Sequence, residues 1–488
     1  MTDSMRVRNR KLHIFLLSAL VLLVALLSIT NRSLWIDEVC RVSDAAVGDF
    51  RRAMRFGFNC AQPGYVLLMY LWARLFPGVP GEFALRCSNL VFTAIALFFA
   101  FRIVEKKKWP LWTVLVFFVH PMFTYYANET TPYILMYALA LAFVDRVYFA
   151  EDFSAVGNVV RINVIFFLGV SVHFIFGFLI VPYLVQCFLK IRKEKKLVLR
   201  HAGIMAAFCV LYLPLLYLYM KYMEGASTGF SLRNVLYVVY AFLGMAGLAL
   251  SRTDLRAGNF GSLTPLHIAL LALFVLVAVV IFVICLRKKP GFLKKNRDLA
   301  LGGAAFLTAM ILAAIPAHFG MWERHCMTIF PIYCILLTDM MLEIGREKTG
   351  RIALIALYVL LVFSCANLRL NADYATDDMR AASARVREAY AQTDDLTVIS
   401  DFDFAYYPVS KARTGESQGY VYTYHMPEDE ILSNFETAQG KGSAMLVLSE
   451  HYASRALYRR FDDDSAYRVD ASCKGYKIVT PAGQDDTD

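Results

Sequence analysis

The chain has 488 residues, of which 58% are hydrophobic and 18% are charged, and its mean hydropathy is +0.49. Many apolar stretches approach twenty residues, the length that crosses about 30 Å of hydrocarbon. This composition excludes a soluble globular protein and predicts a polytopic α-helical membrane protein. The formal net charge is +10. Because the positive excess lies mostly in loops between apolar runs, it indicates contact with anionic lipid headgroups in the bilayer and no nucleic-acid partner.

The first apolar run, residues 12–29, is long enough to cross a bilayer. No small-residue cleavage site follows it, so we expect a retained membrane-spanning helix. The basic segment "MRVRNRK" before it then stays in the cytoplasm. The next segment, "SLWIDEVCR" at 33–41, therefore faces the outside and presents Asp37 and Glu38 directly behind Trp35, a residue type that favours the interface. Cys40 and Cys60 both fall in this first external region and could pair, although two free thiols are the favoured interpretation.

Lysine and arginine gather in four short loops, which the positive-inside rule assigns to the cytoplasm. They are "EKKK" at 105–108, "KIRKEKK" at 190–196, "RKKPGFLKKNR" at 287–297 and "EIGREKTGR" at 343–351. Four spans are expected between the first two loops, at 110–126, 130–149, 161–172 and 173–189. All four basic loops can lie in the cytoplasm only if the apolar segments 62–76 and 231–250 do not cross the membrane. We therefore expect these segments to form short external or re-entrant helices within external loops 30–82 and 221–263. We predict about eleven transmembrane helices, with thirteen as the alternative.

The composition changes after about residue 370. The last 118 residues lack long apolar runs and hold 21 acidic against 12 basic residues. Segments resembling strands lie at 396–400, 420–424, 444–450 and 476–480, and they alternate with helical stretches near 376–391, 427–438 and 451–461. We therefore expect a transmembrane domain at 1–370 and a small soluble α/β domain at 371–488. The topology places this second domain outside the cytoplasm of a cell whose plasma or inner membrane holds the first.

Five polar clusters fall on the predicted external side. They are "WIDEVCR" at 35–41, "CAQPGYVLLMYLWARLFPGVPGEFALR" at 60–86, "HPMFTYYANETTPYILMYAL" at 120–139, His173 and "FGMWERH" at 319–325. Ionisable side chains at membrane depth are costly and usually mark a site or a pathway. The external face is therefore the predicted functional face.

Five segments together resemble a known family. They are "LWIDEVCR", "QPGYVLLMYLWARLF", "EFALRCSNLVFTAIAL", "PMFTYYANETTPYILMYALAL" and "RHCMTIFPIY". Their order is similar to that in the GT-C superfamily of polyprenyl-phosphate-dependent glycosyltransferases, near the protein O-mannosyltransferases and the lipid A aminoarabinose transferases. The resemblance covers most of residues 10–345 and leaves out the tail.

The resemblance implies a GT-C-like fold and a reaction. A sugar would move from a polyprenyl-phosphate donor to an acceptor on the extracytoplasmic side, with inversion at the anomeric carbon. It carries a catalytic acid of the first external loop onto Asp37, with Glu38 beside it, and a second acidic position onto Glu129. A carboxylate within about 3 Å of an acceptor hydroxyl can take its proton as the new bond forms, which contributes roughly 10²- to 10⁴-fold.

The chain departs from the family pattern at two positions. Gln62 precedes Pro63 where many relatives have His-Pro-Pro or Lys-Pro, and Thr131 stands where relatives have Arg. Donor phosphate or sugar contacts are therefore expected from Arg324, His325, His173, Arg41, Lys221 and the neutral Gln62. Contacts to the acceptor, or an orienting role, are expected from Glu129, Tyr126, Tyr133 and Tyr65.

Alternatives remain open. The structural roles that these residues could have are helix capping for Asp37, hydrogen-bond acceptance for Glu38 and Glu129, core packing for His173, and interfacial placement for Arg324 and His325. The alternative function is a membrane transporter or lipid flippase, but the charges cluster at one face and no internal repeat is visible. No cofactor is implied with certainty, and a divalent cation at the paired acids is possible but not expected. The sugar and the acceptor, whether an envelope glycan, a lipid or a protein, stay open.

Overall fold

The computed structural model describes residues 3–30, 32–34, 36–78, 80–222, 232–250, 263–288, 291–315, 322–370, 378–393, 395–400, 420–423, 426–450 and 453–482. The chain divides into two compact units. Unit 1 comprises Met1–Ile29, Met54–Leu68 and Arg86–Ala375, and unit 2 comprises Thr30–Ala53, Met69–Leu85 and Thr376–Asp488.

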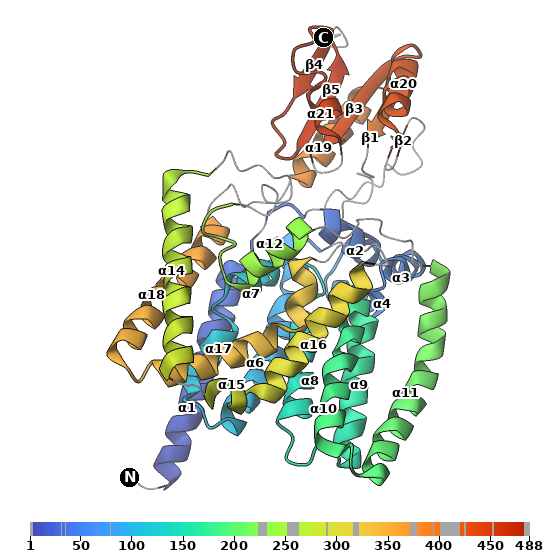
Figure 1. The fold of residues 1–488 in the computed structure, drawn as a ribbon. Coiled ribbons are helices and arrows are strands. Elements are labelled where there is room, and N and C mark those ends of the chain that lie inside the picture. Colours follow the sequence, from blue (N-terminus) through green and yellow to red (C-terminus); the bar gives the residue numbers. More distant parts are fainter. Residues whose placement is uncertain are drawn as a thin grey trace. The chain divides into compact units, whose positions relative to one another are not determined.

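Unit 1 is helical (Figure 1). Its helices are α1 (Asp3–Ser28), α6 (Ser88–Lys106), η1 (Leu111–Phe117), α7 (Pro121–Ala127), α8 (Tyr133–Tyr148), α9 (Val156–Val172), η2 (Phe174–Leu179), α10 (Ile180–Ile191), α11 (Lys195–Tyr222), α12 (Leu232–Phe242), α14 (Pro265–Lys288), α15 (Gly291–Lys295), α16 (Arg297–Ala314), η4 (Glu323–Thr328), α17 (Phe330–Ile344) and α18 (Lys348–Leu370). Two further helices, α3 (Phe50–Asn59) and α4 (Pro63–Ala73), contribute residues to both units.

Seven helical stretches among the described residues are long and apolar enough to cross a membrane. They are Asn9–Ser28, Glu82–Lys106, Phe174–Ile191, Lys195–Tyr222, Pro265–Arg287, Arg297–Ala314 and Lys348–Leu370. The prediction of a multi-pass helical membrane protein is thereby confirmed, whereas the figure of eleven spans stays a prediction. The two segments expected not to cross form α4 and α12, each of 11 residues. At 1.5 Å per residue each is about 17 Å long, too short to cross.

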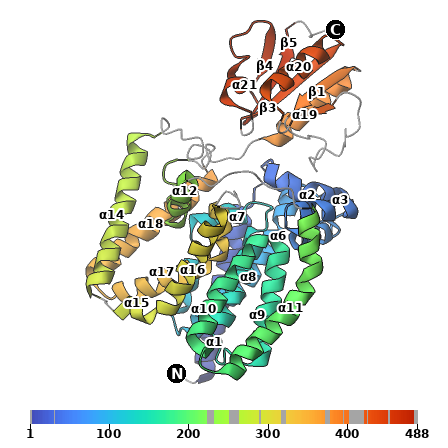
Figure 2. The ribbon, with the colours of Figure 1, turned by 45° about the vertical axis from the view of Figure 1, so that its right-hand side comes forward.

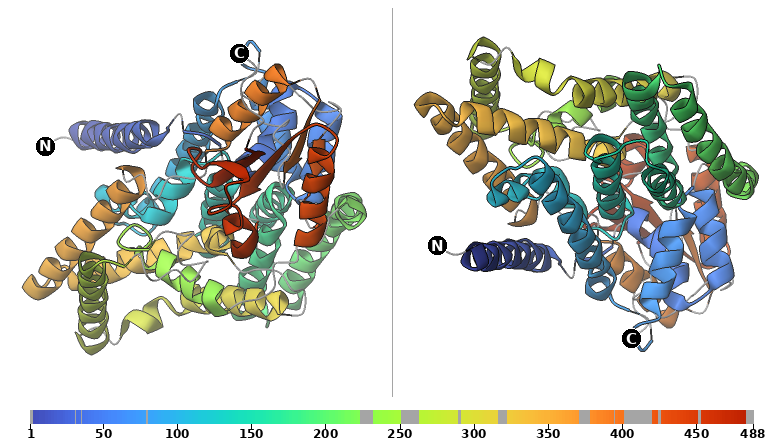
Figure 3. Two further views of the ribbon diagram at one scale, coloured as in Figure 1. Left: turned by 90° about the horizontal axis from the view of Figure 1, so that it is seen from above. Right: turned by 90° about the horizontal axis from the view of Figure 1, so that it is seen from below.

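Helix α8 lies at the centre of unit 1. It packs against α6, α9, α10 and α17, and nearly all of its side chains are buried. A helix that is apolar all round is one that protein covers on every side. Ala96 and Ala100, one turn apart on α6, are fully buried, and small side chains allow helices to approach closely. Helices α9, α10 and α11 continue the bundle beside α8 (Figures 2 and 3).

The segment 110–126 differs from the single span that its hydropathy predicts. It forms two short helices, the 3₁₀ helix η1 and the α-helix α7, which are separated at Phe118–His120. Pro121 occupies the first helical position of α7, and the imidazole of His120 caps the helix by accepting a hydrogen bond from the N–H of Met122. Proline has no N–H to continue a preceding helix, so the chain restarts there.

Unit 2 combines part of the loop at 30–82, which was predicted to be external, with the C-terminal α/β domain. Its elements are α2 (Ile36–Val47), α5 (Glu82–Arg86, whose last residue belongs to unit 1), α19 (Met379–Gln392), β1 (Leu396–Ser400), β2 (Tyr420–Tyr422), α20 (Glu428–Gln439), β3 (Ser443–Ser449), α21 (Arg455–Arg459), β4 (Tyr467–Asp470) and β5 (Tyr476–Pro481). The five strands form one mixed sheet in the order β2-β1-β3-β5-β4. Strand β1 pairs in parallel with β2 and β3, whereas β5 is antiparallel to β3 and β4.

The four predicted strands of the tail are confirmed, and β4 is an addition. Helix α20 buries Ile431, Phe435 and Ala438, at a spacing that places them on one helical face. These side chains pack with Leu446 of β3 and Val479 of β5 in a single hydrophobic core. The small C-terminal domain is therefore a sheet covered by a helix. The predicted domain boundary at residue 370 adjoins residues 371–377, which lie outside the described part.

Within unit 2, the C-terminal domain contacts the loop that was predicted to be the first external one. The guanidinium Nε of Arg380 in α19 lies 3.2 Å from Oε1 of Glu82, a carboxylate that is only 2% exposed. The backbone N–H of Arg380 also donates to Oγ of Ser33, at 3.0 Å. Ser33 and Glu82 stand at the two ends of the loop, so one residue of α19 holds both ends.

Candidate active site

The two acidic residues of the first loop begin a helix. Asp37 and Glu38 lie in the first turn of α2, where the positive end of the helix dipole favours negative charge. Glu38 is fully buried, whereas the side chain of Asp37 is 24% exposed. Buried Val39, Val42 and Ala46 give α2 an apolar face that fixes its rotation. The helix therefore leaves Asp37 accessible and encloses Glu38.

Arg41 lies one turn after Asp37 and is almost buried. Its Nη1 is 3.7 Å from Oδ2 of Asp37, and the same nitrogen donates to the backbone carbonyl of Asp37. The guanidinium of Arg41 therefore contacts the start of its own helix, and its role as a donor-phosphate contact stays a prediction. Trp35, the expected interface anchor of this loop, lies outside the described residues.

In unit 1, η4 and α7 join through a buried polar pair. The hydroxyl of Tyr126 donates to Oε1 of Glu323 at 2.6 Å, and both side chains are at most 2% exposed. Hydrogen bonds to a buried carboxylate are stronger than those between neutral groups. A contact of Tyr126 with substrate stays a prediction, and its hydroxyl donates to Glu323, a residue of the polar segment "FGMWERH" that was not itself named as a candidate.

Two imidazoles face the same region of unit 1. His173, between α9 and η2, and His325, in η4, have ring centroids 5.7 Å apart. Nδ1 of His173 accepts from the N–H of Ile175 at 3.2 Å, and Nδ1 of His325 accepts from the N–H of Trp322 at 3.4 Å. In a neutral imidazole the proton then resides on Nε2. Both residues therefore have an Nε2–H donor, the group that an anionic oxygen would need.

Arg324 adds a cation to this cluster. Its guanidinium carbon lies 6.0 Å from the ring centroid of Tyr133 and 6.0 Å from that of Trp322. The ring of Tyr133 in turn lies 6.0 Å from that of His173 and 4.9 Å from that of Tyr126. The structure thus brings together five of the predicted residues, which are Tyr126, Tyr133, His173, Arg324 and His325.

The loop that carries Glu129 is fixed by α6. The side-chain amide of Asn89 donates to the backbone carbonyl of Glu129 at 2.7 Å and to that of Ala127 at 3.1 Å. Glu129 is only 4% exposed, and Thr131 is fully buried. Asn89 sits inside a quoted motif, yet nothing in its spacing predicted these bonds, because its partners lie 38 and 40 residues away.

Gln62 and Tyr65 lie close in sequence to Ala61, whose backbone contacts the segment that follows His173. Both are buried at the start of α4, and the carbonyl of Ala61 accepts from the N–H of Phe174, next to His173. Ala61 has φ +54°, a conformation that favours glycine. Lys221, by contrast, is exposed in the last turn of α11, where its ammonium lies 5.2 Å from the ring centroid of Tyr222.

Among the described residues, no group of three or more His, Cys, Asp or Glu side chains could hold a metal ion. All ten cysteines, including Cys40 and Cys60, are free thiols in the structure. The candidate residues described above include carboxylates, imidazoles and the guanidinium groups of Arg41 and Arg324. Such groups can move a proton and stabilise an anion.

Comparison with known proteins identifies the fold. No protein-family model and no curated protein sequence matches the chain. The crystal structure of ArnT from Cupriavidus metallidurans bound to undecaprenyl phosphate is 13% identical, with a TM-score of 0.52 over 97% of this chain and 99% of that chain. The crystal structure of the Archaeoglobus fulgidus oligosaccharyltransferase in the apo form is 11% identical, with a TM-score of 0.53 over 92% of this chain and 70% of that chain. The chain therefore has the fold of the GT-C glycosyltransferases, as its ordered motifs predicted.

Proposed function

We propose that this chain is an integral membrane glycosyltransferase that moves a sugar from a polyprenyl-phosphate donor to an acceptor on the extracytoplasmic side. The observation that carries the proposal is the likeness of 97% of the chain to ArnT, a protein whose structure holds undecaprenyl phosphate. The acceptor belongs to the cell envelope and is a glycan, a lipid or a protein.

In the proposed reaction, Asp37 is the general base. An acceptor hydroxyl attacks the anomeric carbon as its proton passes to the Asp37 carboxylate. The bond between the anomeric carbon and the phosphate oxygen breaks, and polyprenyl phosphate leaves with the bonding electrons, so the configuration inverts. The partial exposure of Asp37 at the start of α2 supports this role, because a general base must be reachable by its substrate. Glu38, which is enclosed, orients the acceptor or Asp37.

Donor phosphate is assigned to the cluster in unit 1. Arg324 supplies a permanent positive charge, and His173 and His325 supply Nε2–H donors. The buried, hydrogen-bonded frame around them supports the assignment, because preorganised donors stabilise a leaving anion without reorganisation. The remaining contacts to the donor come from Gln62, and those to the acceptor come from Tyr65, Tyr133 and Glu129. Arg41 stabilises the start of α2, and the exposed Lys221 contributes positive charge at the end of α11.

The test is release of polyprenyl phosphate. The purified chain in liposomes is given a panel of undecaprenyl-phosphate hexoses and pentoses together with envelope extract as acceptor, and free undecaprenyl phosphate is measured by mass spectrometry. We expect release from at least one donor and transfer of its sugar to the extract. Movement of an intact donor across the bilayer without cleavage would contradict the proposal and favour the flippase.

A further inference from the structure

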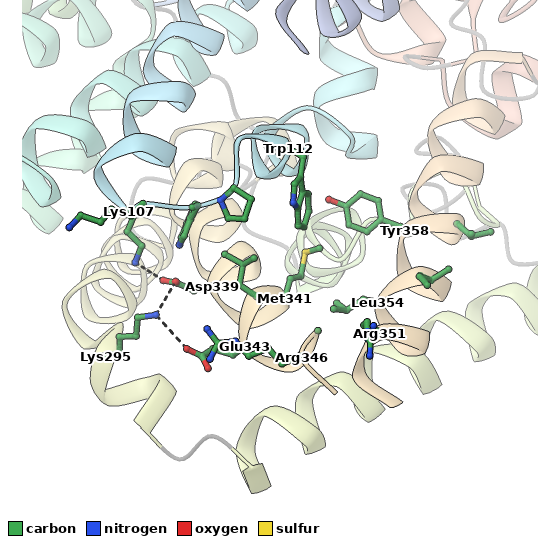
Figure 4. Close-up of a pocket in the computed structure, with 17 residues that line it drawn as sticks. Lys107, Trp112, Lys295, Asp339, Met341, Glu343, Arg346, Arg351, Leu354 and Tyr358 are labelled. Carbon is green, nitrogen blue, oxygen red and sulfur yellow. Dashed lines mark hydrogen bonds and ion pairs between the residues drawn. The ribbon is translucent and has the colours of Figure 1, made fainter. Parts of the chain in front are cut away.

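A pocket of about 860 Å³ lies in unit 1, lined by residues at the C-terminal end of α6 and in α17 and α18, among others (Figure 4). Helix α6 begins beside the Glu129 loop with Asn89 and ends in the pocket with Lys107. Helix α17 begins after η4 and its last turn lines the pocket. The 19 residues of α6 and the 15 residues of α17 correspond to roughly 20–30 Å, so this pocket is separate from the candidate active site.

One part of the pocket is strongly basic. Its charged lining residues are Lys107, Lys108, Lys295, Arg346, Arg351, Asp339 and Glu343. Asp339 is 1% exposed and lies 2.6 Å from the ammonium of Lys107 and 3.2 Å from that of Lys295. Lys295 also lies 3.6 Å from Glu343. These ion pairs, drawn in Figure 4, occupy both acids of the pocket.

Three cations of the pocket remain outside these pairs. Between the residues drawn in Figure 4, no ion pair involves Lys108, Arg346 or Arg351, and all three are exposed. A neighbouring pocket of about 430 Å³ shares Lys107 and Lys295 and extends the basic surface. The pocket therefore has a net charge of +3 from its lining side chains, a charge that favours an anionic ligand.

The rest of the pocket is apolar and aromatic. Its wall is formed by Trp109, Trp112, Leu354, Ile355, Tyr358 and Val359. Ile355 and Val359 on α18 are exposed, although they belong to a helix apolar enough to lie in a membrane. Tryptophan and tyrosine favour the level of the lipid headgroups. A basic end joined to an apolar wall fits a ligand with an anionic head and hydrocarbon chains.

Lys108 adds an independent observation, because its backbone is strained. It follows the C-cap residue Lys107 of α6 and has φ +54°, and the N–H of Trp109 donates to the carbonyl of Val104, which is the pattern of a Schellman motif. Glycine is the usual residue at this position, because a side chain in this conformation costs about 1–2 kcal/mol. Strained residues are more frequent at functional sites than elsewhere. Here the lysine side chain lines the pocket.

We propose that this pocket binds an anionic glycerophospholipid, with the phosphate at Lys108, Arg346 and Arg351 and an acyl chain along α18. Basic pockets between transmembrane helices on the cytoplasmic side suit such headgroups, and the topology predicted from charge assigns this end to the cytoplasm. The site and its test do not depend on sugar transfer. A lipid bound here would join α6, α17 and α18 at one end of the bundle.

Lipid binding to the purified full chain tests the proposal. Phosphatidylglycerol, phosphatidylcholine and free glycerol phosphate are titrated separately, and the bound species are counted by native mass spectrometry. We expect phosphatidylglycerol to bind at least tenfold more tightly than either of the others. Replacing Lys108→Gly, Arg346→Gln and Arg351→Gln together should weaken phosphatidylglycerol binding at least tenfold, since each charge near the headgroups contributes about fivefold.

The control variant carries Lys193→Gln, Lys195→Gln and Lys196→Gln. These lysines are exposed and lie between the end of α10 and the first turn of α11. They do not line the pocket, so the same loss of three positive charges should leave phosphatidylglycerol binding unchanged. Lys108→Gly alone should weaken binding while the melting temperature without added lipid stays equal or rises. Equal binding of phosphatidylcholine, equal loss in the control, or glycerol phosphate binding as tightly as the lipid would each overturn the proposal.

Discussion

Asp37 and Glu38 are neighbours in the sequence but differ in exposure, and this difference separates their expected roles. Asp37→Asn keeps the shape of the side chain and its place in the first turn of α2, while it removes the base. We expect normal folding, normal donor binding and a loss of turnover of at least 100-fold. Glu38→Gln should lower turnover less than Asp37→Asn does. Turnover of the two purified variants with a saturating donor is the measurement, and near-normal turnover of Asp37→Asn would move the base to Glu38 or Glu129.

Arg324 is the permanent cation of the histidine cluster. Arg324→Ala should weaken binding of polyprenyl phosphate, whereas Arg324→Lys should restore it only in part, because the planar fork is lost. Thermal stabilisation by undecaprenyl phosphate measures the binding of each variant. If Arg324→Ala binds as well as the unaltered chain, another group holds the phosphate.

The hydroxyl of Tyr126 donates to Oε1 of Glu323 at 2.6 Å, and both side chains are buried. Tyr126→Phe retains the ring and leaves a buried carboxylate without this donor, at a cost of about 1–3 kcal/mol. We expect a lower melting temperature and a displaced η4, and therefore reduced donor binding. Glu323→Gln, which can still accept from Tyr126, is the control and should lose less stability. Equal stability of Tyr126→Phe and the unaltered chain would show that water replaces the hydroxyl.

The residues of the candidate site were predictable to different degrees. Asp37, Arg324 and His325 stand in motifs whose order along the chain is informative. Glu323 and Asn89 were missed because their roles arise from tertiary contacts. The partner of Glu323 lies 197 residues away, and no periodicity within η4 or α6 encodes such a distance.

At the scale of elements, the packing of α4 on α9 depends on Gly64. A Cβ at this position would lie 2.6 Å from Oγ of Ser171 and 2.9 Å from its carbonyl oxygen. Gly64→Ala should therefore push α4 away from α9 and cost about 1–3 kcal/mol. Gly203→Ala is the matched control, because nothing lies within 4 Å of its Cβ in α11. That change should raise stability by up to about 1 kcal/mol. Melting temperatures compare the two, and equal values would show that α4 and α9 separate without cost.

Hydropathy predicted most helices and strands but not their interruptions. Strand β4 reads "YRVD" and alternates between apolar and polar residues, but it has only four residues and lies at the sheet edge, where it pairs only with β5. The break between η1 and α7 follows from Pro121, a local signal that a continuous apolar run conceals. Helices and strands were therefore predictable where a periodic apolar face is buried. They were less predictable where a single residue, such as Pro121, sets the end of one element and the start of the next.

At the scale of the whole molecule, the order of the sequence motifs predicted the GT-C fold. The orientation of the chain in the membrane is predicted only from the positions of its lysine and arginine residues. The positive-inside rule, applied to the four basic loops, predicts that the tail from about residue 371 lies outside the cytoplasm. A reporter that is active only in the cytoplasm, fused after Asp488, should therefore be silent. The same reporter fused within the loop at 190–196 should be active and serves as the control. A bright signal from the C-terminal fusion would place Asp37 on the wrong side for the proposed reaction.

Arg380 is synthesised long after the residues that it contacts. Ser33 precedes it by 347 residues, and translation at about 5–20 residues per second leaves roughly 15–70 s between Ser33 or Glu82 and Arg380. During that interval, the loop with Asp37 has left the ribosome but lacks the contacts that hold both of its ends. A chain cut short before α19 would keep its membrane helices and its motifs, yet this loop would never be closed. Protein synthesis itself thus delays the maturation of the proposed enzyme until its last quarter is made.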